Sequence, residues 1–170
     1  TAEQFAVQTD SLRINFSFNN RLGTDAVLQK VTVDKFDTTF IQVLGKNKNL
    51  NFSKTVFVPA DKPITQPYWL AKKMEEGYFN VTDQLFIGQP DVDAAYYAFI
   101  EVKIFGEPFK FMRTIRYKFT DPVRGELYQP LTVLPPALIE PDDKIKISKG
   151  NNTFSGVLNI TGKKKGFQTF

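Results

Sequence analysis

The fold of this chain is decided by residues 96–119, which read YYAFIEVKIFGEPFKFMRTIRYKF. On each half of this stretch, every second residue belongs to one mostly apolar face: Tyr96, Ala98, Ile100, Val102 and Ile104 on the first half, and Phe109, Phe111, Arg113, Ile115, Tyr117 and Phe119 on the second. A period of two residues is typical of a half-buried strand. Between the halves, Gly106-Glu107 before Pro108 supplies a reversal. We therefore expect an antiparallel hairpin with two long arms.

The opposite face of the second arm is basic. It carries Lys110, Met112, Thr114, Arg116 and Lys118. A basic stripe on one strand face is in most proteins a solvated face, and the alternative is a docking surface for an acidic partner. The residues alone leave both interpretations open.

Four further strands are expected before the hairpin. The clearest lies within residues 12–18, where the apolar residues at every second position are Leu12, Ile14, Phe16 and Phe18. A second strand covers Ala26–Val33, with Val27, Val31 and Val33 as its apolar members. A weaker third strand covers Phe36–Leu44, and a fourth covers Leu50–Val58. Polar turns at 19–23 and 45–49 separate them.

A segment held by two prolines follows the fourth strand, because residues 63–70 read PITQPYWL. Proline fixes φ and lacks an N–H, so this segment cannot be a helix interior or a central strand. We expect an extended crossover whose Tyr68 and Trp69 fill the core; the alternative is a surface platform that stacks on a sugar ring. Short strands are expected at Tyr78–Val81 and Leu85–Ile87, and the only helical candidate is Tyr68–Glu76.

The composition agrees with an all-β chain and removes several kinds of chemistry. Of the 170 residues, 42% are hydrophobic and 17 are phenylalanine, which suits a pleated, half-buried surface. Without cysteine, the chain has no disulfide, thiolate nucleophile or Cys-ligated metal. Without histidine, it lacks the Ser-His and Cys-His pairs and the commonest zinc ligand. No apolar run reaches the length of a membrane span, so we expect no membrane insertion.

Few residues suggest a site. The net charge is only +4, and Lys163-Lys164-Lys165 is interpreted as a solvated turn, so we expect no nucleic-acid partner. Asp91 and Asp93 are near Pro90 in a turn, where Asp is an ordinary residue. Asp142-Asp143 is at most a weak calcium ligand pair, because no repeat of oxygen ligands follows it. We expect no enzyme activity, no catalytic residue, no cofactor and no metal ligand in this chain.

Three multi-residue stretches stand in a definite order along the second half of the chain. They are 63–70 (PITQPYWL), 85–90 (LFIGQP) and 117–130 (YKFTDPVRGELYQP), and the last continues into Leu131–Pro136 (LTVLPP). Together they resemble the region downstream of the catalytic domain in large bacterial PIG-L (LmbE-like) deacetylases. In that family the segments run TQPYWL, LIG-x-P and DPV-x-GE-x-YRP at similar spacing, and Gln129 stands here where an arginine is common. The resemblance covers most of residues 60–136.

The resemblance implies an accessory β-sandwich of immunoglobulin-like type in an exported protein of a Gram-negative bacterium, and hence a periplasmic or extracellular location. It also implies an upstream catalytic domain of the same polypeptide, similar to zinc-dependent hydrolases that remove acetyl groups from N-acetylglucosamine conjugates. The metal motif of those hydrolases, His-x-x-Asp-Asp, needs a histidine. No catalytic residue of the family is therefore carried over to this chain.

The expected architecture is all-β, with two unequal units. Residues 1–125 are expected to form an antiparallel β-sandwich, residues 126–136 a Pro-rich linker, and residues 137–170 a partial second β unit. Further short strands are expected at Leu131–Leu134, Lys144–Ser148 and Thr153–Thr161. A tail this short rarely folds alone. We favour the interpretation that it starts a second domain that the chain cuts short; the alternative is that it packs on the first unit. The chain begins Thr-Ala-Glu, and we expect it to be a fragment or a processed product.

Two functions follow as hypotheses. The first is a non-catalytic accessory domain that supports or orients the deacetylase domain, and it predicts a buried Trp69 and an apolar patch that faces a partner. The alternative is a carbohydrate-binding module, which predicts that Trp69 is exposed in a groove. The candidate carbohydrate contacts for that module are Tyr68, Trp69, Tyr96 and Tyr97.

Overall fold

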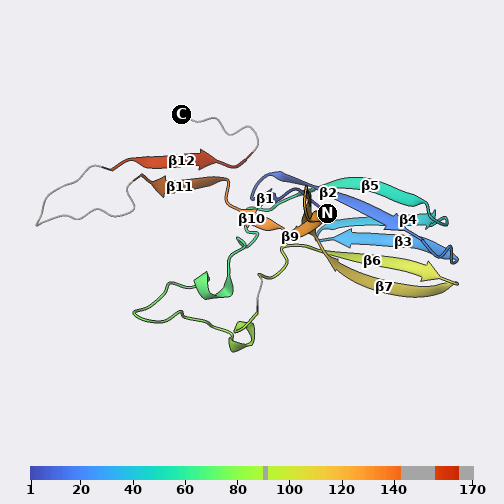
Figure 1. Ribbon diagram of the computed structural model, residues 1–170, viewed down its shortest axis with the longest axis horizontal. Coiled ribbons are helices and arrows are strands. Elements are labelled where there is room, and N and C mark those ends of the chain that lie inside the picture. The colour runs from blue at the N-terminus through green and yellow to red at the C-terminus, as the bar shows by residue number, and fades with distance from the viewer. Residues whose placement is uncertain (90–91, 143–155, 165–170) are drawn as a thin grey trace, which may run out of the picture.

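A computed structural model describes residues 1–89, 92–142 and 156–164, and it confirms the all-β, sandwich-like fold. One sheet has four strands in the order β4-β3-β6-β7, and β2 pairs with β5 in the layer that faces it (Figure 1). The bounds are Ser11–Asn19 for β2, Ala26–Val33 for β3, Phe36–Val43 for β4, Asn49–Phe57 for β5, Tyr97–Ile104 for β6 and Glu107–Thr114 for β7. All neighbours within these sheets run antiparallel.

Strand β2 shows how the sequence forms the sandwich. Its burial alternates residue by residue, with Leu12, Ile14 and Phe16 inside the core and polar residues between them outside. Phe16 lies opposite Phe52 of β5, and their rings stack with centroids 4.9 Å apart. Across the core, Phe40 of β4 approaches Phe52 at the same distance. The predicted strand, and the core that it builds, are confirmed.

Strand β3 has the predicted bounds, but one of its expected core residues is different. A bulge between Leu28 and Lys30 shifts the register against both β4 and β6. A bulge inserts one extra residue, so side chains on either side of it can share a face although their spacing is odd. Leu28 and Val31 are accordingly both buried, and Val27, which the period of two favoured, is only half-buried.

The decisive hairpin is confirmed in its first arm and corrected in its second. β6 buries Ala98 and Val102, and β7 pairs with it from Glu107 to Thr114. The predicted second arm does not run on to Phe119, because the chain leaves the sheet at Ile115. The Ile115 side chain is buried, and its N–H donates to the Tyr96 carbonyl at 2.9 Å.

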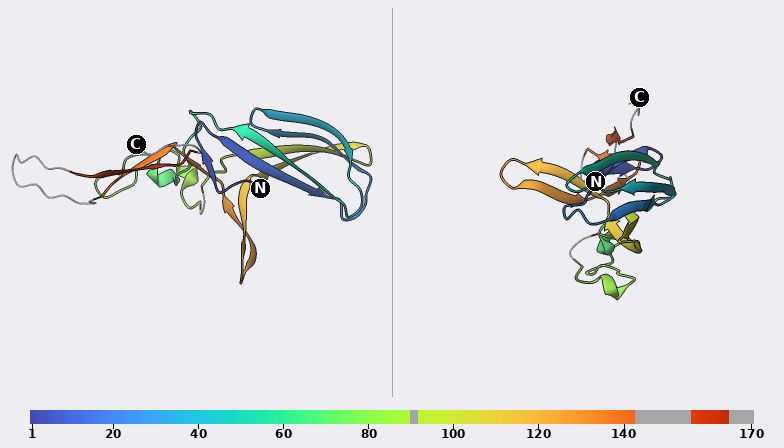
Figure 2. Two further views of the ribbon diagram at one scale, coloured as in Figure 1. Left: turned by 90° about the horizontal axis from the view of Figure 1, so that it is seen from above. Right: turned by 90° about the vertical axis from the view of Figure 1, so that its right-hand side faces the viewer.

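Beyond Ile115 the chain forms a separate hairpin of β8 (Arg116–Asp121) and β9 (Gly125–Pro130), which stands off the sandwich in Figure 2. Its turn is held by the Asp121 carboxylate, which accepts from the N–H groups of Val123 at 2.9 Å and Arg124 at 2.8 Å. Gly125 completes the turn at a φ of 77°, which glycine adopts without strain. Ala2 links this hairpin to the sandwich, because it bridges Ile14 on one side and Tyr117 on the other.

Residues 126–136, the expected Pro-rich linker, contain most of β9 and also the strand that was expected at Leu131–Leu134. After β9 comes β10 (Thr132–Leu134), which pairs in parallel with β1 (Phe5–Val7). Leu131 and Val133 are fully buried within the core cluster of the sandwich. This segment therefore packs with residues 1–125. The division of the chain into domains stays a prediction.

The described part of the tail forms one more hairpin, β11 (Ala137–Pro141) with β12 (Leu158–Gly162). β12 overlaps the predicted strand 153–161 over residues 158–161 and ends one residue beyond it. The predicted strand 144–148 and residues 153–155 lie outside the described residues. In Figure 1 this hairpin extends away from the sandwich.

The segment between β5 and β6 has no strand in its described part, contrary to expectation. It contains two short 3-10 helices, η1 (Tyr68–Leu70) and η2 (Gln84–Phe86), so the predicted strands at 78–81 and 85–87 are wrong. Of the helical candidate Tyr68–Glu76, only the three residues of η1 are helical. Figures 1 and 2 show it as a loop that projects from one end of the sandwich. We call residues 62–89 and 92–95 the projecting loop. In the part of the chain described here, no helix has the length and apolar character needed to span a membrane.

Candidate functional site

Residues that lie far apart in the sequence meet at the base of the projecting loop. The Val133 N–H of β10 donates to the Thr65 hydroxyl oxygen at 3.0 Å, and the Thr65 N–H donates to the Val133 carbonyl at 3.2 Å. A side-chain and a backbone hydrogen bond thus join the loop to a fully buried residue of the core. The first of the three stretches that resemble the deacetylase region is therefore in direct contact with residues 131–136, the continuation of the last.

The middle stretch, residues 85–90, contacts the first stretch through Tyr68. The Gly88 N–H donates to the Tyr68 hydroxyl oxygen at 3.3 Å, and the Tyr68 ring stacks on Phe86 with centroids 6.3 Å apart. Trp69 meets Tyr68 edge to face, with centroids 4.9 Å apart. Offset and edge-to-face arrangements are the favoured ones for aromatic pairs. Tyr68 therefore connects the two 3-10 helices of the loop.

Local sequence explains why the loop turns where it does. Pro67 sits before η1 with a φ of −57° and a ψ of 144°, an extended conformation that the proline ring favours. Asp83 caps η2, because its carboxylate accepts from the Leu85 N–H at 2.9 Å. Gly88 then takes a φ of 90°, which brings its N–H to Tyr68 and which other residues rarely adopt. The short apolar runs of the loop thus lie between turns.

A pocket of about 480 Å³ lies between the two arms of the projecting loop. Its lining combines apolar side chains with polar ones from both arms, among them Lys62, Gln66, Tyr68, Gln89 and Asp93. Concave sites that mix apolar walls with a few polar groups are the usual form of small-ligand sites. Trp69 lies outside this lining.

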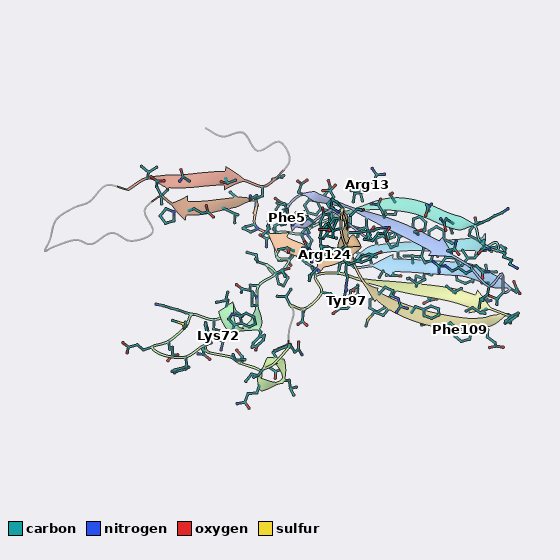
Figure 3. The ribbon with its side chains drawn as sticks, in the orientation of Figure 1. Phe5, Arg13, Lys72, Tyr97, Phe109 and Arg124 are labelled. Carbon is teal, nitrogen blue, oxygen red and sulfur yellow. The ribbon has the colours of Figure 1, made fainter. Side chains whose placement is uncertain are left out.

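The apolar residues of the projecting loop are largely in solvent. Trp69 is 37% exposed, so the expectation that it fills the interior is wrong. Leu85 reaches 84% exposure. The other exposed large apolar residues of the loop are Ile64, Leu70, Met74, Tyr78, Phe79 and Ile87. We call these exposed residues, with Trp69 and Leu85, the loop patch; the loop that carries them stands away from the sandwich in Figure 3, where Lys72 marks it.

The four candidate carbohydrate contacts fall into two groups. Tyr68 and Trp69 lie together on the loop, as the sequence placed them. Tyr96 and Tyr97 belong to the sandwich end where β6 starts, and Figure 3 shows Tyr97 there. Tyr96 is only 2% exposed, so neither face of its ring is open to a sugar from solvent. Tyr97 is half-buried.

Tyr96 has an unusual environment for a buried tyrosine. The Lys62 ammonium lies 3.9 Å from the centre of its ring, within the range of a cation–π contact. Its hydroxyl is buried and has no hydrogen-bond partner among the described residues. Burial, helped by the negative charge of Asp34, raises the pKa of Tyr96 to about 12. The ring is thus a structural contact between the loop and the core.

The predicted basic stripe is divided by the break at Ile115. Lys110 belongs to β7 and forms an ion pair with Glu101 at 3.4 Å, whereas Lys118 belongs to β8 and pairs with Glu126 at 2.6 Å. The same ion pair holds the pKa of the Glu126 carboxyl below its usual value. These cations therefore lie on two separate hairpins and are largely matched by acids.

The other candidate sites lie partly outside the described residues. This holds for Asp91, Asp143 and Lys165, so their predicted pairings are not described. Within residues 1–89, 92–142 and 156–164, no group of three or more acidic side chains is placed to hold a metal ion. Sequence reasoning also did not single out Thr65, Phe86 and Gly88 as site residues. The signal that could have found them is that all three lie in the ordered stretches of the resemblance.

Comparison with known proteins identifies no relative: no family model, no curated protein and no solved structure matches this chain.

Proposed function

We propose that this chain is a non-catalytic, immunoglobulin-like β-sandwich accessory domain of an exported PIG-L (LmbE-like) deacetylase, and that it supports or orients the catalytic domain of the same polypeptide. One observation carries the proposal. Two of the three stretches that resemble the deacetylase region, 63–70 and the described residues of 85–90, lie in the projecting loop and meet through Tyr68 and Gly88. Thr65 of the first stretch also hydrogen-bonds to Val133, in the continuation of the third stretch, whereas residues 117–130 form the separate β8–β9 hairpin.

The surface chemistry of the projecting loop favours a protein partner. Contiguous exposed apolar patches larger than a few hundred Å² usually mark interaction sites. The accessory hypothesis predicts a buried Trp69, which its exposure contradicts, and an apolar patch that faces a partner. The loop patch supports the second of these, because exposed side chains such as Leu85 and Ile87 stand on a base that is hydrogen-bonded to β10. Aromatic residues on a well-supported surface are typical of interface centres. An adjacent domain would remove this patch from water.

The proposal is tested in the natural polypeptide that contains this chain. Substituting Leu85→Ser together with Ile87→Ser removes exposed apolar side chains without touching the core. We expect deacetylase kcat/KM on an N-acetylglucosamine conjugate to fall about thirtyfold, which corresponds to the roughly 2 kcal/mol of one interface hot spot. Amide exchange at residues 64–87 should become faster at the same time. Leu22→Ser, at an 83% exposed position of the β2–β3 turn, is the matched control and should change neither readout.

Two results would count against the accessory role. One is a loop that exchanges as fast in the natural polypeptide as in the isolated chain, because a docked patch must be protected. The other is a natural polypeptide whose remaining domains have no deacetylase activity.

Fractionation of the producing cells tests the export part of the proposal. We expect the protein in the periplasm or outside the cell.

A second candidate function, carbohydrate binding, is favoured by the pair Tyr68 and Trp69. Their rings lie edge to face beside a pocket of about 480 Å³, and Trp69 is accessible to solvent. Trp69 is the lone tryptophan of the chain, so its fluorescence reports on this place alone. Titration with oligomers of N-acetylglucosamine should quench or shift its emission, and Tyr68→Ala should abolish the response. Unchanged emission at millimolar sugar would reject this candidate.

A further inference from the structure

Strand β7 is an edge of the four-stranded sheet and is exposed along its whole length. Phe109 and Phe111 lie opposite Val102 and Ile100, on the side of the sheet that faces the core. Both rings are nevertheless exposed, and Figure 3 shows Phe109 at the outer margin of the molecule. At the other edge of the same sheet, Phe40 of β4 packs across the core on Phe52. In the described residues, β7 is therefore the edge whose core-side aromatics are left uncovered.

An exposed edge strand presents unpaired N–H and C=O groups that can pair with another strand. The sequence of β7 makes it complementary to itself. In an antiparallel pair of two β7 strands centred on Phe111, the two Phe111 rings face each other, Phe109 faces Arg113, and Lys110 faces Met112. These are an aromatic pair, two cation–π pairs and two apolar contacts of a lysine stem.

Charge selects this register over its neighbour. The middle of the strand Glu107–Thr114 lies between Lys110 and Phe111. Two symmetric pairings, one centred on each of these residues, therefore pair most of the strand. Centring the pair on Lys110 would place two ammonium groups opposite each other at the centre, and directly opposed like charges destabilise a sheet, although Glu107 would then face Arg113 at each end. Centring it on Phe111 opposes no like charges and places the two Phe111 rings at the centre. The register centred on Phe111 is therefore the one that avoids central repulsion.

We infer that β7 is a self-association edge, at which a second copy of this chain adds its own β7 antiparallel in the register centred on Phe111. The two four-stranded sheets then become one continuous sheet. The inference is independent of the proposed accessory function, because the loop patch lies beyond the other end of the sandwich from the tip of the β6–β7 hairpin (Figure 1).

The expected dimer is weak. An edge-to-edge pair of eight-residue strands buries less than the roughly 1,200 Å² of a standard protein interface, so we expect micromolar affinity or weaker. Sedimentation of the purified chain should therefore show a mass that rises with concentration from 19.4 kDa toward twice that value. Phe111→Lys places two like charges on the symmetry axis and should hold the mass at 19.4 kDa, with an unchanged circular dichroism spectrum.

A cysteine pair tests the register itself, because the natural chain has no cysteine. Opposed Cα atoms in an antiparallel pair are about 4.5–5.5 Å apart, within the roughly 4.4–6.8 Å that a disulfide spans. Phe111→Cys should form a disulfide-linked dimer at least about tenfold faster than Ile41→Cys, since strand pairing raises the local thiol concentration. Ile41 lies on β4, the opposite edge, and is 88% exposed, so it measures random collision.

Three outcomes would overturn the inference. They are a mass that stays at 19.4 kDa at the highest concentration reached, a Phe111→Lys variant that associates as the natural chain does, and equal rates of disulfide formation at positions 111 and 41. Should Phe111→Lys fail to fold, the two cysteine variants decide the question, because their reduced forms keep side chains of apolar character at exposed positions.

Discussion

The β2–β5 pair and the projecting loop are both rich in aromatic residues, but most of those of the strands pack in the core and those of the loop are partly exposed. In β2 and β5, Phe16 and Phe52 stack on each other and pack against the other sheet. In the loop, Tyr68, Trp69 and Phe86 contact one another, yet Trp69 stays exposed to solvent. The first group has a partner strand within the chain. The second has a rigid base but no covering layer among the described residues.

The difference teaches what an apolar run needs in order to be buried. A strand of period two buries one face only when a neighbouring strand satisfies its backbone hydrogen bonds and a second layer covers it. β2 has both. The runs at 78–81 and 85–87 are as apolar as β10, but they lie between turns at Gly77, Asp83 and Gly88 and find no partner strand.

The largest expected effect on stability comes from removing a side chain from the core beneath the β2–β5 pair. Ile14→Ala removes a side chain with no exposed surface and should destabilise the chain by about 2–5 kcal/mol. Ile41→Ala, on the exposed part of β4, should change stability by less than about 0.5 kcal/mol. Urea unfolding followed by circular dichroism measures both. Similar costs at the two positions would mean that Ile14 does not lie in the core.

The next largest effect is expected at the hydrogen bond between Thr65 of the loop and Val133 of the sandwich core. Thr65→Val keeps the size of the side chain but removes the oxygen that accepts from the Val133 N–H, and this costs about 1–3 kcal/mol when the donor stays buried. Amide exchange at Val133 and residues 63–70 should speed up more than exchange in β2. Thr38→Val, a replacement on β4, is the control. Unchanged exchange at Val133 would show that the hydroxyl does not anchor the loop.

A smaller effect, of opposite sign, is expected at Tyr96. Tyr96→Phe removes a buried hydroxyl that has no partner in the described residues, so stability should stay equal or rise by up to about 1 kcal/mol. Because burial raises the pKa of Tyr96 to about 12, the natural chain should lose stability as pH rises from 10 toward 12. The variant should lack this part of the loss. A destabilised variant would mean that the hydroxyl does have a partner.

The smallest effect concerns the β8–β9 turn, outside both regions. Backbone N–H groups of Arg124 and Val123 hold the pKa of Asp121 below its usual value. A carboxylate with a lowered folded-state pKa stabilises the fold above its ordinary pKa and loses that contribution as pH falls through the lowered value. Amide exchange within 116–130 should therefore accelerate below about pH 4. In Asp121→Asn this acid-dependent step should be missing, and exchange in β2 serves as the internal reference.

The elements that sequence reasoning identified share a common property. β2, β3 and β5 follow a local rule, since the period of two that marks each strand is read from its own residues, although β2 pairs with β5 and β3 with β6 across long sequence separations. The bulge in β3 could not be seen, because its apolar pattern Val27, Leu28 and Val31 fits either register. The break at Ile115 was missed for another reason. The alternation of residues 109–119 is continuous, and the break arises only because β6 starts at Tyr97, which pairs with Thr114 and leaves no β6 residue to pair with β8.

The site was foreseen in part. Tyr68 and Trp69 stood out as adjacent aromatics in a proline-rich segment, and they do lie together. Their exposure was not predictable, because burial depends on which distant segment covers them. The bonds from Thr65 to Val133 and from Tyr68 to Gly88 join residues 68 and 20 positions apart. The order of the three resembling stretches was the only sign that they belong together.

The parallel pairing of β1 with β10 also affects how this chain is made. Phe5 sits beside Thr132, and nearly the whole sandwich is encoded between them. On a ribosome, the amino-terminal strand must therefore wait, unpaired, until almost all later strands have emerged. Closing so long a loop is slow, and the waiting strand is vulnerable to wrong partners. We expect chains interrupted before Leu131 to be the ones that chaperones and proteases capture.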